Sequence, residues 1–136
     1  MISSSAQIRV RFAETDAMGI AYHGNYFAWF EVARIAMLDS LGLSYSALHK
    51  SGMHLPVLEV GAKYIRSAFF DDTLEIRAEI REKPLLKIRV DYEVRRGDEL
   101  LCAGHSVHAF VNSKGVPIRP PAEFMEKIKS KFAEDK

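Results

Sequence analysis

The sequence predicts an α+β fold in which a curved antiparallel sheet wraps around one long buried helix. Three segments between residues 58 and 95 alternate apolar and polar residues with a period of two, which indicates strands, and a fourth, further along, is apolar on both faces. Residues 25–41 instead repeat their apolar side chains at helical spacing and contain neither proline nor glycine. The connections between the strands are too short for the crossovers of a parallel sheet. One helix against a curved antiparallel sheet buries both sets of apolar faces.

The first part of the chain is predicted to form a short strand, a loop and the buried helix. Ile8, Val10 and Phe12 alternate with polar residues and suggest the strand. Between residues 25 and 41 the apolar side chains cover almost the whole circumference of a helix, so we expect this helix to be buried nearly all round. Gly42 provides its end.

Four long antiparallel strands are expected after the helix. Residues 58–64, 74–81 and 86–95 each place apolar side chains on one face and polar or charged ones on the other. Residues 100–111 are more apolar on both faces, so we expect this strand in the middle of the sheet or at an interface.

Turn residues separate the strands, and a last helix follows them. Lys83-Pro84 supplies one turn and Arg96-Gly97-Asp98 supplies the next. From Glu123 the chain has the pattern of a short, Lys-rich amphipathic helix that Pro120-Pro121 opens.

Length and charge restrict the organisation and the partners of the chain. Its 136 residues fit one domain, residues 1–136. The net charge is +1, from nineteen basic and eighteen acidic side chains without a long block of one sign, which argues against nucleic acid as a partner. The most apolar stretch, residues 26–38, contains Glu31 and Arg34 and is too short for membrane insertion. Residues 1–7 lack an apolar signal-peptide core, so we expect a cytoplasmic protein.

Several reactive side chains are given structural interpretations. Cys102 is the single cysteine, which excludes an internal disulfide, and we expect it to be inert packing. His105 and His108 are three apart on one strand and point to opposite faces, so they cannot chelate one metal ion together. His49 and His54 are interpreted as surface residues.

The segment that carries chemistry joins the first strand to the helix. Residues 11–26 place two carboxylates, Glu14 and Asp16, together with His23 in a loop that ends at a helix N-terminus. Unpaired N–H groups and the helix dipole favour negative charge there. Such donors stabilise a developing oxyanion, and a nearby carboxylate can act as nucleophile or general base. The loop therefore has the parts for acyl transfer, with helix capping as the alternative role for its carboxylates. Glu14 and Thr15 are interpreted as loop residues, either solvated or holding the loop by hydrogen bonds.

A family resemblance rests on these residues. The run Asp16-Ala17-Met18-Gly19-Ile20-Ala21-Tyr22-His23-Gly24-Asn25-Tyr26 resembles the signature of the 4-hydroxybenzoyl-CoA thioesterase family of hotdog-fold proteins, closest to its YbgC-type acyl-CoA thioesterase branch. Residues 69–74 and 111–120 are weaker matches to the same branch. The resemblance covers nearly the whole chain.

The resemblance implies roles for individual residues. Asp16 matches the catalytic carboxylate, as nucleophile or general base, and the backbone N–H of His23 matches the donor that polarises the thioester carbonyl, with the His23 side chain as a further catalytic candidate. Met18 stands where the YbgC-type branch usually has glycine, which would narrow the acyl pocket. Arg66 is one of several basic residues that would meet the CoA phosphates, beside Lys63, Arg89, Arg95 and Lys114. The predicted substrate-binding residues are Gly19, Tyr22, Gly24, Asn25, Tyr26 and Arg66.

The resemblance also implies the assembly and the ligands. A hotdog monomer wraps its sheet around the long helix, and active sites lie between subunits, so we expect a homodimer or homotetramer. The implied substrate is an acyl-CoA, with acyl-carrier protein as a further candidate partner. We expect no metal and no cofactor, because CoA is part of the substrate.

Two other functions remain as alternatives. A hotdog dehydratase acting on a hydroxyacyl thioester would need His23 and Glu31 to converge across a dimer. A non-catalytic module would bind an acyl thioester or acyl-carrier protein. Glu31 and Arg34 are otherwise expected to form an ion pair on the helix or to face the dimer interface.

Overall fold

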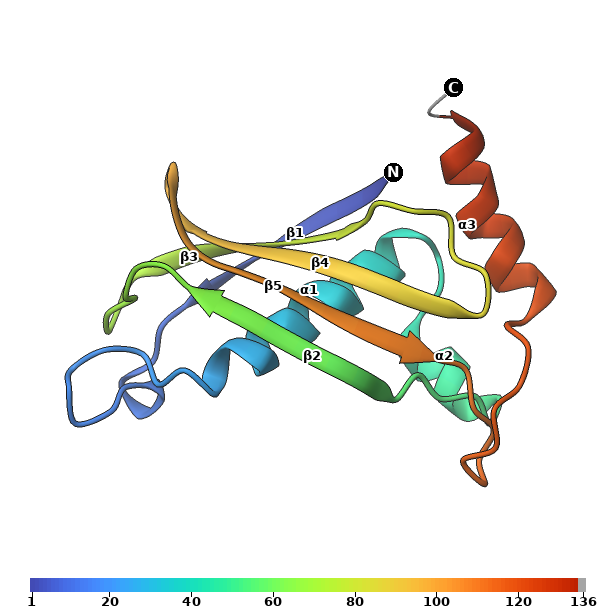
Figure 1. Ribbon diagram of the computed structural model, residues 1–136, viewed down its shortest axis with the longest axis horizontal. Helices are drawn as coiled ribbons and strands as arrows, with labels where there is room; N and C mark the ends of the chain where they lie inside the picture. The colour runs from blue at the N-terminus through green and yellow to red at the C-terminus, as the bar shows by residue number, and fades with distance from the viewer. Residues whose placement is uncertain (135–136) are drawn as a thin grey trace.

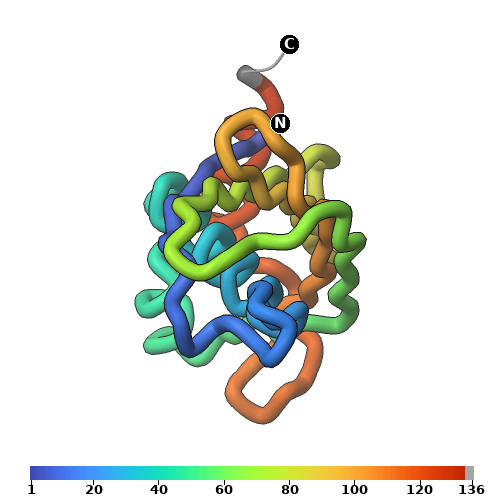
Figure 2. Tube along the Cα trace, turned by 90° about the vertical axis from the view of Figure 1, so that its left-hand side faces the viewer, coloured from blue at the N-terminus to red at the C-terminus, as the bar shows by residue number. Residues whose placement is uncertain are grey.

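The computed structural model describes residues 1–134 and has an antiparallel five-stranded sheet curved around one long helix (Figure 1). The strand order is β1-β3-β4-β5-β2. Viewed from the end of the molecule, the sheet curves past the long helix α1 (Figure 2). The predicted α+β class is confirmed. The elements are β1 (Ile2–Arg9), a 3-10 turn (Phe12–Glu14), α1 (Asn25–Ser40), α2 (Tyr45–Lys50), β2 (Val57–Tyr64), β3 (Thr73–Ile80), β4 (Lys87–Arg96), β5 (Glu99–Ala109) and α3 (Ala122–Glu134).

The first strand is longer than predicted and begins earlier. β1 pairs with β3 along its whole length, from Ile2 opposite Ile80 to Arg9 opposite Thr73. Between Ile2 and Ile8 its inward positions are the small residues Ser4 and Ala6, which give a weak hydrophobic signal. Phe12 was predicted in this strand but lies in the 3-10 turn with 75% of its surface exposed.

The long helix is buried on one face only, which corrects the expectation that it is buried nearly all round. Its inner face packs on the curved sheet, and the ring of Phe30 stacks on Tyr92 of β4 at a centroid distance of 4.4 Å. On the other face Phe27 is 39% exposed and Val32 is 46% exposed. A single sheet covers one side of a helix, so the apolar outer face stays open in one chain. The inner face is formed by Tyr26, Trp29, Phe30, Ala33, Met37 and Leu38.

The predicted strands are present, but they differ in burial. β3 and β4 alternate buried and exposed residues as expected, and β5 lies inside the sheet between β4 and β2. β2 is an edge strand, and the expectation that one of its faces packs on a core is wrong for the single chain. Leu58 is 52% exposed, Val60 is 40% and Tyr64 is 43%.

Two short helices complete the fold. α2 was not predicted; it has six residues, and the only signal for it is Ser44, whose hydroxyl caps the helix by accepting from Ala47 N–H at 3.3 Å. α3 begins one residue before the predicted Glu123. It buries Phe124 against Phe110, with ring centroids 4.8 Å apart.

A chain of buried hydrogen bonds crosses the core between α1 and the sheet. Arg34 Nη1 donates to the Tyr92 hydroxyl at 3.0 Å, and Tyr92 and Ser106 hydroxyls lie 2.6 Å apart. Ser106 Oγ is 2.8 Å from Nε2 of His108, and its Nδ1 is 3.2 Å from the Leu55 carbonyl. With His108 neutral, Nδ1 donates to the Leu55 carbonyl and Nε2 accepts from the Ser106 hydroxyl. Ser106 then accepts from Tyr92 and Tyr92 from Arg34, so each hydroxyl donates one bond and accepts another. Burial, followed by the charge of Arg34, lowers the pKa of His108 to about 4.

The two strand histidines behave as the spacing predicts. His105 lies on the other face, where Nε2 is 2.9 Å from Glu59 of β2.

The predicted ion pair on α1 is present, with Arg34 Nη2 3.9 Å from Glu31.

Acid is expected to destabilise the fold through His108. In the unfolded chain this imidazole takes up a proton near pH 6.5, whereas in the folded chain it does so only near pH 4. The contribution of neutral His108 to the free energy of unfolding is therefore fully present above about pH 6.5. It falls by about 3 kcal/mol as the pH drops towards 4. Urea unfolding between pH 4.5 and 7.5 measures this slope, which the His108→Gln variant should flatten. His105→Gln serves as the control because it leaves His108 untouched; equal slopes in wild type and His108→Gln would refute the assignment.

Candidate active site

A buried carboxylate fixes the loop between β1 and α1. Glu14 is only 8% exposed, and its carboxylate accepts from Arg11 N–H at 2.8 Å and from Trp29 Nε1 at 2.9 Å. Its backbone carbonyl accepts from Tyr22 N–H at 2.8 Å and from the Asn25 side-chain amide at 2.7 Å. Burial raises the pKa of the Glu14 carboxyl, but the hydrogen bonds from Arg11 and Trp29 outweigh it and hold the pKa below its ordinary value. Glu14 therefore ties the loop to α1 as an acceptor of hydrogen bonds.

Asp16 begins a tight turn in this loop. Its Oδ1 accepts from Met18 N–H at 2.9 Å, and its backbone carbonyl accepts from Gly19 N–H at 2.9 Å. The backbone closes again where Asp16 N–H donates to Ile20 at 3.0 Å. Gly19 has φ of +79°, a conformation that L side chains rarely adopt, so the turn requires glycine at this position. One carboxylate oxygen of the half-buried Asp16 is used by the turn, and the other has no partner among the described residues.

Two backbone donors are left open at the start of α1. The carbonyl of Tyr22 accepts from Asn25 N–H at 3.0 Å, and the carbonyl of His23 accepts from Tyr26 N–H at 3.3 Å. Within residues 1–134, no acceptor is recorded for the N–H groups of His23 and Gly24. Such groups at a helix N-terminus attract a negatively charged oxygen.

A pocket of about 170 Å³ is lined in part by His23, the residue of the first donor. It includes three residues predicted from the sequence, His23, Tyr26 and Arg66. Arg66 is exposed over 63% of its side chain and lies 3.7 Å from Glu99, so it can reach solvent at the pocket. The lining residues are Ile20, Ala21, His23, Tyr26, Tyr64, Ile65, Arg66 and Ser67.

Five lining residues were not among the predicted site residues. Ile20 and Ala21 belong to the loop motif, and the other three are Tyr64, Ile65 and Ser67. These three come from the end of β2 and the loop after it, which the pairing of Tyr64 with Cys102 of β5 brings to this point. No local signal in the strand pattern marks them as site residues. The loop is held near α1 where Ala21 N–H donates to the Ala68 carbonyl at 2.8 Å.

An arginine on β4 keeps this loop in place. Arg96 donates to the Asp72 carboxylate at 2.7 Å and to the Ser67 carbonyl at 3.2 Å. Its guanidinium also lies 5.8 Å from the centre of the Phe69 ring. The pocket wall is therefore anchored to the sheet and not only to the helix.

Other predicted site residues lie on the same loop but do not line the pocket. Asp16 and Gly19 form the turn, and the Asn25 amide is already bonded to the loop backbone. The centre of the Tyr22 ring lies 4.4 Å from that of the His23 ring. A Cβ at Gly24 would come within 2.7 Å of the Tyr22 ring. Met18 is 76% exposed and lines no part of this pocket.

The buried hydroxyl and thiol nearby are kept protonated. Burial raises the pKa of Tyr26 to about 12, and burial likewise raises the pKa of Cys102 to about 12. Cys102 is fully buried, which agrees with the interpretation as inert packing.

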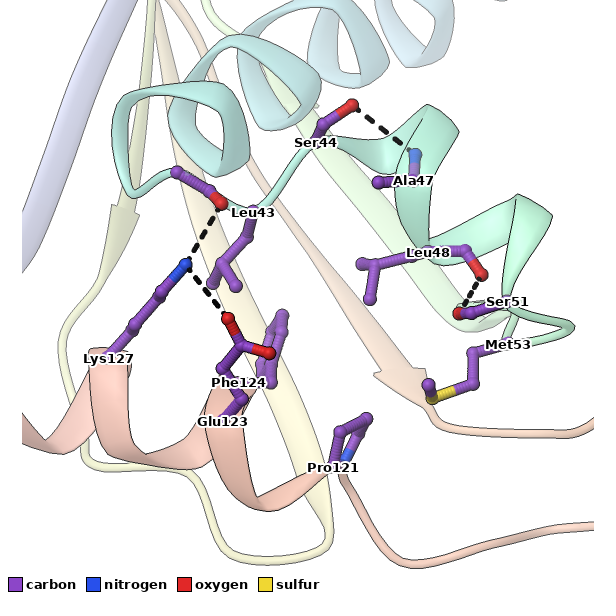
Figure 3. Close-up of a pocket in the computed structure, with 11 residues that line it drawn as sticks. Leu43, Ser44, Ala47, Leu48, Ser51, Met53, Pro121, Glu123, Phe124 and Lys127 are labelled. Carbon is purple, nitrogen blue, oxygen red and sulfur yellow. Dashed lines mark hydrogen bonds and ion pairs between the residues drawn. The ribbon is translucent and has the colours of Figure 1, made fainter.

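A second pocket, of about 250 Å³, lies between α2 and α3, far along the chain from the loop of Asp16 (Figure 3). Lys127 lines this pocket, and its ammonium group is already paired. Its Nζ donates to the Gly42 carbonyl at 3.1 Å and lies 3.5 Å from Glu123. The Ser51 hydroxyl donates to the Leu48 carbonyl at 2.7 Å. The Lys127 bond ties α3 to the turn after α1, and the Ser51 bond closes the end of α2. Among residues 1–134, no cluster of three or more His, Cys, Asp or Glu side chains is arranged to hold a metal ion.

The fold and the site define a hotdog-type domain of the thioesterase class. Residues 10–132 match the model of the Thioesterase-like superfamily. The chain therefore belongs to this superfamily of thioester hydrolases, and the family predicted from the sequence is confirmed.

Individual relatives agree with this membership. A protein of Aquifex aeolicus whose name describes it as an esterase is 35% identical over 122 residues, 89% of this chain and 94% of that protein. The acyl-CoA thioesterase YbgC of Haemophilus influenzae is 26% identical and covers 94% of this chain and 93% of its own. The DHNA-CoA thioesterase structure from Staphylococcus aureus superposes with a TM-score of 0.94 at 31% identity, over 99% of this chain and 94% of that one.

No helix within residues 1–134 combines the length and the apolar run needed to cross a bilayer.

Proposed function

We propose that the chain hydrolyses an acyl-CoA thioester at the junction between the Asp16 loop and α1. The observation that carries this proposal is the pair of open N–H groups at His23, which lines the pocket, and at the next residue, Gly24. The thioester carbonyl oxygen accepts from these donors as it gains negative charge, and one such donor is worth about 10²–10³-fold in rate. The names of the relatives support the same substrate class.

Asp16 supplies the attacking group in this proposal by one of two routes. In the first, a carboxylate oxygen of Asp16 bonds to the thioester carbon, CoA leaves as the thiolate, and water then cleaves the mixed anhydride. In the second, the carboxylate takes a proton from water, and the hydroxide oxygen bonds to the same carbon. Both routes end in the free acid and CoA, whose thiolate regains a proton.

The chain is proposed to act as a homodimer or a homotetramer. The outer face of α1 exposes Phe27 and Val32, and the edge strand β2 exposes Leu58 and Val60, so both surfaces suit a second copy of the chain. Asp16 does not line the pocket of its own chain. A site completed between two copies would join carboxylate and pocket.

The remaining roles belong to the same proposal. Arg66 contacts a CoA phosphate from the mouth of the pocket, and Tyr22 covers the bound thioester. Gly19, Gly24, Asn25 and Tyr26 shape the loop and pocket that receive it. Hydrolysis needs no metal or cofactor, the protein works in the cytoplasm, and acyl-carrier protein is a second candidate carrier of the acyl group.

Thiol release from a panel of acyl-CoAs tests the function. The panel contains 4-hydroxybenzoyl-CoA, 1,4-dihydroxy-2-naphthoyl-CoA, and straight-chain esters of short and long length. We expect free CoA from at least one class, and the ranking of kcat/KM identifies the acyl group. Binding without release from any ester would contradict hydrolysis and favour a binding module. A 3-hydroxyacyl-CoA in the panel that gives an enoyl product without free CoA would favour the dehydratase alternative.

A further inference from the structure

The two open N–H groups at the start of α1 each belong to a peptide whose carbonyl oxygen accepts a hydrogen bond from the first turn of the helix. The Gly24 N–H shares its peptide with the His23 carbonyl, and the His23 N–H shares its peptide with the Tyr22 carbonyl. A trans peptide is planar, so its C=O and N–H point in opposite directions. Because the Tyr22 and His23 carbonyls accept from Asn25 and Tyr26 further along the helix, both N–H groups point out of its N-terminus. Gly24 has no side chain to cover its own N–H.

The His23 carbonyl differs from its neighbour because it has a second donor. The hydroxyl of Tyr64 donates to it at 2.8 Å, whereas among the described residues the Tyr22 carbonyl accepts from the Asn25 N–H alone. Tyr64 is the last residue of β2, 41 positions away along the chain. Its ring meets Tyr26 edge-on at 5.0 Å and His23 at 6.1 Å, which fixes where the hydroxyl lies.

This second bond has two physical effects on the peptide. It restrains rotation of the peptide plane, because the carbonyl is now held from β2 as well as from α1. It also polarises the peptide, and a hydrogen bond at the carbonyl strengthens the N–H as a donor. Burial, followed by the neighbouring Cys102 and Tyr22, raises the pKa of the Tyr64 hydroxyl, so it remains a proton donor at neutral pH.

We propose that Tyr64 is a positioning residue that aims the Gly24 N–H at the substrate, so that the thioester oxygen receives two backbone donors. The His23 N–H is the first donor and the Gly24 N–H is the second. This inference rests on the proposed hydrolysis and extends it to a residue of the edge strand. The hydroxyl acts through the His23–Gly24 peptide and does not touch the reacting atoms.

Replacing Tyr64 with Phe removes the hydroxyl and keeps the ring. We expect kcat to fall about tenfold, a fraction of the loss caused by deleting an oxyanion donor. KM should change less than about twofold, because the bond matters most when the oxygen carries charge. The affinity for a non-hydrolysable acyl-CoA analogue, with a methylene in place of sulfur, should be similarly unchanged. The amide cross-peak of Gly24 in a ¹H–¹⁵N spectrum should move.

Tyr45→Phe is the matched control, since Tyr45 lies on α2 and its hydroxyl bonds to no partner within residues 1–134. Thermal unfolding shows that each variant is folded at the assay temperature. Equal kcat in wild type and Tyr64→Phe overturns the inference alone, and so does a loss that falls entirely on KM. No thiol release by wild type from any ester overturns the proposed function and this inference with it.

Discussion

Replacing Asp16 with Asn is expected to lower kcat by about 10²–10⁴-fold, the range usually contributed by a catalytic base. Asparagine keeps a side-chain carbonyl oxygen that can accept from Met18 N–H, so the turn that ends at Gly19 should persist. What disappears is the negative charge and the oxygen able to attack carbon or accept a proton. The affinity for the methylene-substituted acyl-CoA analogue should therefore remain nearly the same. Steady-state thiol release and equilibrium binding measure the two quantities.

Asp39→Asn provides the control for charge, because Asp39 is exposed near the other end of α1. It makes the same change in net charge far from the loop and should leave kcat unaltered. Undiminished turnover in Asp16→Asn would remove Asp16 from the mechanism and leave the helix N-terminus as the source of catalysis. A loss of analogue binding in that variant would instead assign Asp16 to substrate binding.

The strands were predictable because their burial follows from local sequence. β3 and β4 each have one face on the core and one in water, so Ile76 and Tyr92 alternate with charged neighbours. The period of two survives in the sequence wherever a strand separates core from solvent. The first part of β1 was not predicted, because Ser4 and Ala6 point inwards and small residues carry little hydrophobic signal.

Burial of α1 was overestimated for a different physical reason. Hydrophobic periodicity reports which side chains avoid water in the final assembly, without saying what covers them. The side chains of Phe27 and Val32 are apolar but exposed in one chain. Leu58 and Val60 of β2 are exposed in the same way. The burial predicted from the sequence would agree with the structure if these apolar surfaces contact another copy of the chain, as proposed above.

The candidate site also contains residues that the sequence predicts and residues that only the fold brings together. Asp16 and His23 became candidates because they are close together in sequence before a helix, and the family resemblance then gave each its expected role. Tyr64 and Ser67 could not be named, because only the pairing of β2 with β5 brings them to that helix. Glu14 could be recognised as a loop carboxylate, but its bond to Trp29 depends on the packing of α1.

Gly104→Ala is expected to be the most damaging single methyl addition in the fold. A Cβ at this position of β5 would lie 2.6 Å from the Phe30 ring and 2.7 Å from the backbone carbonyl of Gly61. Neither neighbour can move easily, since Phe30 is 1% exposed and stacked on Tyr92, and the Gly61 carbonyl belongs to the paired strand β2. Overpacking of a rigid core costs about 3 kcal/mol. For a domain of this size the loss corresponds to roughly 10 °C in Tm.

Gly61→Ala is the matched control because it adds the same methyl one strand away. There the three atoms nearest to the new Cβ all belong to the His105 ring, the first at 2.8 Å, and this partly exposed side chain can turn aside. The strain is thus relieved, and the lower entropy of the unfolded chain offsets what remains, so we expect a net change within about 1 kcal/mol. Urea unfolding of both variants compares the two effects directly. Equal losses at Gly104 and Gly61 would show that the sheet moves away from α1 more easily than the close contact of Phe30 implies.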